Sequence, residues 1–196
     1  AEALMGTIRI SGNLDHFWKD LLELEENGEI IKTRFGTYGL PEKMGLVVGR
    51  FQLTSKGFGF VIPDNKGERP DVFIPPRALG GAMNNDRVMA RVESSSGGNK
   101  PEGEIIRIIT HANNKIVGIF HQSGDFGFVT PDDKHIGQDI YIMKRHFGGA
   151  KTNQKVVAEI TEWPVERRNA EGKIIEILGN VGDVGLEILS KCMKII

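Results

Sequence analysis

The chain contains two copies of one domain, and this repeat limits what it can fold into. Residues 56–61 (KGFGFV) return 68 positions later as residues 124–129 (GDFGFV). Further matches follow at the same offset, which becomes 69 before this stretch and near the end of each copy. A fixed offset with single-residue slips indicates a duplicated domain. Because two copies are too few for a solenoid, each copy must close a core of its own.

Each copy contains five strand-like runs with no helical pattern between them. The runs are residues 46–53, 57–62, 71–75, 86–93 and 103–109 in the first copy, and residues 115–121, 125–130, 138–143, 154–162 and 172–178 in the second. Five short strands in one small domain favour a closed or nearly closed barrel. The predicted fold class is therefore mainly β, with two tandem five-stranded barrels.

The residues before the first copy predict a helix followed by a hairpin. Asn13 can cap a helix that ends at Gly28, and apolar residues recur at helical spacing between them. Residues 30–34 and 37–40 then resemble two strands joined by a turn. A helix followed by a hairpin is the second half of a winged helix-turn-helix, so we expect a small partial winged-helix element.

Two interpretations of this element stay open. Lys32, Arg34 and the hairpin tip would contact structured nucleic acid in one, and the element would be a docking domain or structural cap in the other. The polar side of the helix carries Glu23, Glu25 and Glu26, which disfavours insertion into a DNA groove. The acidic helix therefore favours the docking interpretation.

Phe58 and Phe60 predict an aromatic surface on each barrel. Residues two apart in a strand project from the same face, so the two rings would lie side by side with Lys56 at their edge. Such a surface suits unpaired bases, with one cation for a phosphate. The alternative is that both rings fill the core. The second copy, with Phe126 and Phe128, favours the binding surface.

The charge balance restricts how nucleic acid could be held. The net charge is −1, whereas nucleic-acid-binding domains are usually basic. An extended coat of positive charge is therefore excluded, and base stacking with a few local cations would have to supply the affinity.

Neither metal binding nor catalysis is predicted for this chain. The five His residues have no ligand spacing, and no pair of carboxylates has a spacing typical of metal or acid–base sites. Cys192 is alone, which excludes an internal disulfide and predicts the cytoplasm. We expect no membrane partner, because no apolar run is long enough to span a bilayer and no leader precedes the first domain.

The glycine-rich residues 179–185 are predicted to be a linker. Their spacing fits neither the dinucleotide fingerprint nor the P-loop. A short helix is expected over residues 186–193.

These motifs together resemble a known family. A KGFGF strand followed by the DVFI strand at residues 71–74 resembles the paired motifs of bacterial cold-shock domains, which are five-stranded OB barrels. The order of a partial winged helix, residues 38–41 (YGLP), two such barrels and Gly182-Asp183 resembles the N-terminal region of the bacterial ribonuclease R family, in the RNase II superfamily. The resemblance implies domains at residues 1–44, 45–112 and 113–180, with residues 181–196 leading toward a catalytic domain.

The resemblance also implies function and site residues. The function would be single-stranded RNA binding for a 3′→5′ exoribonuclease, with possible contact to structured RNA through the winged-helix element. Magnesium is expected only in the catalytic domain, which this chain lacks, so no cofactor is expected here. The implied RNA-binding residues are Phe51, Lys56, Phe58, Phe60, Phe73, Arg77, Phe120, Phe126, Phe128, Tyr141 and Arg145.

The chain departs from the cold-shock pattern at three places. Pro75 replaces a His of the second motif, and in the second barrel Gly124 and Asp125 replace Lys56 and Gly57. An acidic residue beside the rings should weaken the approach of a phosphate, so the first barrel is predicted to be the stronger RNA binder.

Three other functions stay open as alternatives. A free-standing cold-shock-type RNA chaperone is the first of them. An enzyme in its own right and a winged-helix DNA regulator are less favoured.

Overall fold

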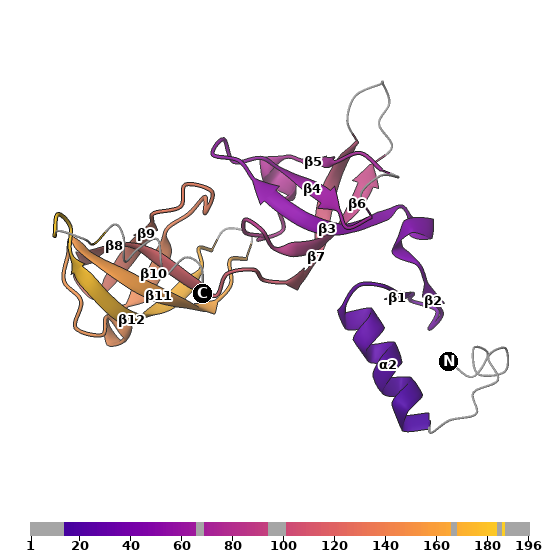
Figure 1. Cartoon of the computed structure of the whole chain (residues 1–196), viewed down its shortest axis with the longest axis horizontal. Coiled ribbons are helices and arrows are strands. Elements are labelled where there is room, and N and C mark those ends of the chain that lie inside the picture. Colours follow the sequence, from indigo (N-terminus) through magenta and orange to yellow (C-terminus); the bar gives the residue numbers. More distant parts are fainter. Residues whose placement is uncertain (1–13, 66–68, 94–100, 166–167, 184–185, 187–196) are drawn as a thin grey trace.

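Each copy of the repeat forms a closed barrel of five strands (Figure 1). The first barrel contains β3 (Leu46–Leu53), β4 (Gly59–Pro63), β5 (Val72–Ile74), β6 (Arg87–Glu93) and β7 (Glu102–Thr110). The second contains β8 (Lys115–Ser123), β9 (Phe126–Pro131), β10 (Ile140–Met143), β11 (Gln154–Glu162) and β12 (Glu171–Asn180). This computed structural model describes residues 14–65, 69–93, 101–165, 168–183 and 186. The predicted fold class is confirmed.

The two barrels have the same topology. The strand order is β3-β4-β5-β7-β6 in the first barrel and β10-β12-β11-β8-β9 in the second, where β8 takes the place of β3. One parallel contact closes each barrel, between β5 and β7 and between β10 and β12. All the other strand pairs in the barrels are antiparallel.

A fully buried phenylalanine lies at the centre of each barrel. Phe51 and Phe120 have no exposed surface. A Cβ atom added to Gly59 would lie 2.3 Å from the Phe51 ring, and one added to Gly127 would lie 2.4 Å from the Phe120 ring. The glycine of the repeated Gly-Phe-Val run, Gly59 or Gly127, therefore leaves the space that the core ring occupies.

The prediction that Phe51 and Phe120 stack on bases is wrong. Phe51 pairs directly with Val61 across β3 and β4, and Phe120 pairs with Val129 across β8 and β9. Directly paired residues point to the same face of a sheet, and that face is the core here. The two rings stabilise the barrels by packing and are not available to a ligand.

The N-terminal element consists of α2 (Leu14–Glu26) and a small hairpin of β1 (Ile31–Lys32) and β2 (Tyr38–Gly39). Gly28 ends the helix with a φ of 71°, as predicted, while the Glu29 backbone N–H donates to Leu24 O. Gly28 also lies against the first barrel, because a Cβ there would be 2.6 Å from Ile109 Cδ1. The helix and the hairpin predicted from the sequence are both present.

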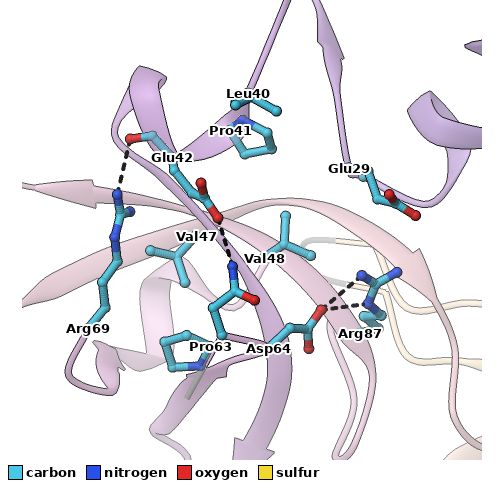
Figure 2. Close-up of a pocket in the computed structure, with 12 residues that line it drawn as sticks. Glu29, Leu40, Pro41, Glu42, Val47, Val48, Pro63, Asp64, Arg69 and Arg87 are labelled. Carbon is cyan, nitrogen blue, oxygen red and sulfur yellow. Dashed lines mark hydrogen bonds and ion pairs between the residues drawn. The ribbon is translucent and has the colours of Figure 1, made fainter. Parts of the chain in front are cut away.

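Two arginines join this element and its connection to the first barrel (Figure 2). Arg87 forms an ion pair with Asp64 and donates to Asn27 O at 2.8 Å. Arg69 donates to Glu42 O and to Leu46 O. A cavity of about 350 Å³ lies between these contacts, with Leu40 and Pro41 on its wall. These contacts agree with a docked element, the interpretation that the acidic helix favoured.

The predicted linker at residues 179–185 begins later than expected. Strand β12 continues to Asn180, so Gly179 and Asn180 belong to the barrel. Asp183 Oδ2 then accepts a hydrogen bond of 2.7 Å from the Asn180 backbone N–H, which closes a turn. Leu186 is buried, and the rest of the helix predicted over residues 186–193 lies outside the described residues.

Within the described part of the chain, no helix is both long and apolar enough to cross a membrane.

The two barrels meet at a joint formed by Asp86, His111 and Trp163. Asp86 is fully buried and accepts hydrogen bonds from the backbone N–H groups of Met83 and Ala112, and its Oδ2 lies 2.9 Å from His111 Nδ1. The His111 ring stacks on the Trp163 ring of the second barrel at 3.4 Å between centroids. Met83 reaches into the core of the second barrel. A buried carboxylate thus fixes the segment that connects the barrels.

Replacement of Asp86 by Ala should destabilise the protein. The buried backbone N–H of Met83 and the partly buried N–H of Ala112 would lose their acceptor, which predicts a fall in the free energy of unfolding of about 2–4 kcal/mol, measured by urea denaturation. Gln154→Ala is the matched control at the equivalent position of the second barrel. Gln154 accepts from the Lys151 N–H in a half-buried site, so its loss should cost less than about 1 kcal/mol. Equal losses for the two variants would contradict the assigned role of Asp86.

Candidate nucleic-acid interface

Three aromatic rings form one cluster on the outside of the first barrel. Phe60 pairs directly with Phe73 across β4 and β5, and Phe58 lies just before β4. The ring centroids are 5.5–5.9 Å apart, and all three residues are half-buried. We call these three residues the first triad. The prediction that Phe58 and Phe60 project from the same face is confirmed.

The second barrel carries the same cluster. Phe128 pairs directly with Tyr141 across β9 and β10, and Phe126 completes the second triad. Its centroids are 5.5–5.8 Å apart. Phe126 is 36% exposed, and its ring lies within 26° of parallel to that of Tyr141. Because partly exposed rings outside a barrel core can offer flat apolar area to bases, both triads are candidates for a base-stacking surface.

Each triad has a polar neighbour that sequence reasoning missed. Gln52 lies opposite Phe60 in the β3–β4 ladder, and His121 lies opposite Phe128 in the β8–β9 ladder. Both side chains are exposed. The signal that could have found them is strand alternation, because each follows a core phenylalanine and must point outward.

The predicted cations differ in their surroundings. Lys56 is exposed in the turn before β4, and within the described residues it makes no ion pair. Arg77 is exposed and forms an ion pair of 3.1 Å with Glu102, which offsets part of its charge. Arg145 is exposed and donates to His146 Nε2. Within the described residues, Lys56 and Arg145 are therefore the predicted cations that make no ion pair with a carboxylate.

The acidic residue of the second barrel is neutralised. Lys144 Nζ lies 2.6 Å from Asp125 Oδ1, and this hydrogen bond, together with the charge of the lysine, lowers the pKa of Asp125 below its ordinary value. The carboxylate is thus ionised and paired at neutral pH. Because the pKa of Asp125 is lowered, the ion pair stabilises the folded protein fully at pH values above the ordinary pKa of an aspartate. This stabilisation is lost as the pH falls through the lowered pKa. The structure therefore moderates the repulsion that the sequence predicts beside the second triad.

The hairpin of the N-terminal element carries an exposed aromatic residue. Phe35 is 79% exposed at its tip, and the Arg34 guanidinium lies 4.8 Å from the ring centroid. This pair presents a cation and a flat ring together.

The described residues contain no group of three or more His, Cys, Asp or Glu side chains that could hold a metal ion. The interface is accordingly one of aromatic faces, amides and single cations.

The barrels and their outward triads define a tandem OB-fold protein of the cold-shock type. Residues 128–195 match the cold shock domain family, and residues 49–108 match the ribonuclease B OB domain family. The chain is 35% identical to ribonuclease R of Thermotoga maritima over 88% of its length, and 33% identical to that of Vibrio parahaemolyticus over 85%. The chain belongs to the ribonuclease R family.

The chain spans about a quarter or less of these relatives, namely 24% and 20% of their lengths. Its fold is similar to that of the apo form of Mycoplasma genitalium RNase R, with a TM-score of 0.67 and 18% identity over 75% of this chain and 24% of that one. The same RNase R in complex with ribose-methylated single-stranded RNA gives a TM-score of 0.65, at 18% identity over 74% of this chain and 23% of that one.

Replacement of Lys144 by Ala should weaken the binding of single-stranded oligo(U) at neutral pH. The unpaired Asp125 carboxylate would repel phosphates beside the second triad, and its pKa would rise toward the ordinary value. Because both groups are exposed, the expected loss of affinity is about two- to fivefold, measured by fluorescence anisotropy. Adding Asp125→Asn to this variant should restore the affinity. No recovery in the double variant would show that Lys144 acts in another way.

Proposed function

We propose that this chain binds single-stranded RNA through its two aromatic triads. The observation that carries the proposal is that both barrels present three rings outward at the same register, with Phe60 opposite Phe73 and Phe128 opposite Tyr141. Stacking on such rings needs unpaired bases, since paired bases are covered by their neighbours. The low net charge supports this mode, because it leaves stacking as the main source of affinity.

We also propose that the chain serves as the substrate-binding part of a 3′→5′ exoribonuclease. Two observations support this: the family membership, and the fact that the chain spans only about a quarter or less of its relatives. Hydrolysis and the magnesium it needs are assigned to a catalytic domain outside this chain. The single cysteine supports a cytoplasmic location.

A free-standing RNA chaperone is the second candidate function. It would trap any unpaired strand, whereas a substrate-binding part should hold a strand next to a duplex. The exposed pair of Arg34 and Phe35 favours the latter, because it offers a second contact for structured RNA. Contact between the partial winged-helix element and a duplex is part of this proposal.

The first barrel should bind RNA more strongly than the second. Phe58→Ala and Phe126→Ala each remove one stacking ring, worth about 1–3 kcal/mol per base, so each should lower the affinity for oligo(U) about tenfold. The larger loss is expected for Phe58→Ala, because Lys56 is unpaired there and the second barrel has Gly124 in its place. Phe35→Ala serves as a control outside the barrels. A larger loss from Phe126→Ala would reverse the ranking, and no loss from either would refute the stacking mode.

The two candidate functions predict different duplex preferences. A substrate-binding part should bind a duplex with a 3′ overhang better than a single strand of the overhang's length, and Arg34→Ala with Phe35→Ala should remove that advantage. A chaperone should bind both equally. Electrophoretic mobility shifts with the overhang duplex, the blunt duplex and the single strand decide between them. Equal affinity for the overhang duplex and the single strand would contradict the exoribonuclease assignment.

A further inference from the structure

A polar cavity lies directly beside the first triad. It has a volume of about 430 Å³, and Phe60 forms one wall. Its polar lining includes Gln52, Ser55, Asn84, Asn85 and His135. This volume lies within the range of ligand pockets in proteins, which is roughly 300–1,000 Å³.

The cavity is completed by the second barrel. His135 belongs to the connection between β9 and β10, which extends toward the turn between β3 and β4 of the first barrel (Figure 1). A Cβ at Gly137 in this connection would lie 3.3 Å from Leu53 Cδ2 at the end of β3, so the two barrels touch here. The equivalent connection of the first barrel lies between β4 and β5, next to the N-terminal element.

The lining is polar but uncharged apart from the imidazole. Within the described residues, no Lys, Arg, Asp or Glu side chain lines the cavity. A phosphate would therefore find no cation in it. A planar group with hydrogen-bonding edges, next to a flat ring, fits this chemistry better.

Several hydrogen-bonding groups remain available in the cavity. Asn84 Oδ1 accepts from the Leu53 backbone N–H at 3.0 Å, which leaves the Asn84 amide nitrogen as a donor. His135 Nδ1 lies 2.9 Å from Asp133 Oδ1, and a carboxylate only accepts, so Nδ1 carries the proton of this contact and Nε2 remains for a contact with a ligand. The Gln52 amide supplies both a donor and an acceptor. Nucleobase edges place donors and acceptors next to one another in the same way.

We propose that this cavity is a base-reading subsite. The nucleotide next to the one stacked on Phe60 would place its base edge against Gln52, Asn84 and His135. The first triad would thus bind any base by stacking. The connection between β9 and β10 of the second barrel would help to discriminate between bases. This inference rests on the proposed single-stranded RNA binding and deepens it.

The test compares the affinities for oligo(U), oligo(C) and oligo(A) of equal length, measured by fluorescence anisotropy on the whole chain. The wild type should prefer one oligomer over another by about tenfold, the discrimination that base-edge hydrogen bonds supply. Gln52→Leu combined with His135→Ala should reduce that preference to within about twofold. Affinity for the least preferred oligomer should stay close to that of the wild type, because the ring stacking is unchanged.

Glu176→Leu is the control. It replaces an exposed polar side chain of β12 that belongs to neither triad and does not line the cavity, so it should leave the preference unchanged. His135→Ala alone alters only an exposed connection, so it keeps the test valid if the double variant is unstable. The His135→Ala variant should reduce the preference between oligomers in the same direction as the double variant, by about half as much on a logarithmic scale.

Three outcomes overturn the inference while RNA binding stands. The wild type could bind all three oligomers equally, the double variant could keep the full preference, or the Glu176→Leu control could lose it. Failure of the wild type to bind any oligomer would instead refute the proposed function itself. Loss of preference only in the Gln52 and His135 variants supports the subsite.

Discussion

The packing of one phenylalanine in each barrel determines where every other ring lies. Phe51 fills the centre of the first barrel and needs a residue without a side chain at Gly59, and Phe120 and Gly127 repeat this arrangement. With the glycine on the inner face, the flanking phenylalanines must point outward. The Gly-Phe-Gly-Phe motif is thus both a core motif and a surface motif. Any slip of the register by one residue would bury Phe60 and expose the core.

The two copies keep this packing and differ at their edges. Position 86 carries a buried aspartate that holds His111 against Trp163, whereas the equivalent Gln154 contacts the Lys151 N–H of its own loop and Asn180 of the same barrel. Among the residues that the structure describes, Lys56 near the first triad makes no ion pair, whereas Asp125 beside the second triad is paired with Lys144. The first barrel thus carries the buried carboxylate of the joint, and the second carries the connection that reaches its neighbour.

Most of the fold follows from local patterns in the sequence. The repeat, the strand-like runs and the helix that ends at Gly28 each depend on neighbouring residues, and all three are confirmed. The position of Phe51 was predicted wrongly, because its motif position suggested stacking, while its pairing with Val61 depends on the register between two strands. The sequence does not indicate that the two barrels meet through Asp86, Trp163 and His135. The contacts of these residues are fixed only when the two barrels pack together. The outward rings were predicted, whereas their polar neighbours were missed although strand alternation could have indicated them.

The central claim is that bases stack on the outward rings and never reach the core rings. Photo-crosslinking with a 4-thiouridine oligonucleotide, followed by mass spectrometry of the crosslinked peptides, tests it most directly. We expect crosslinks at Phe58, Phe60, Phe73, Phe126, Phe128 or Tyr141, and none at Phe51 or Phe120. Crosslinks confined to the N-terminal element, or spread over faces of the barrels that carry no triad, would contradict it.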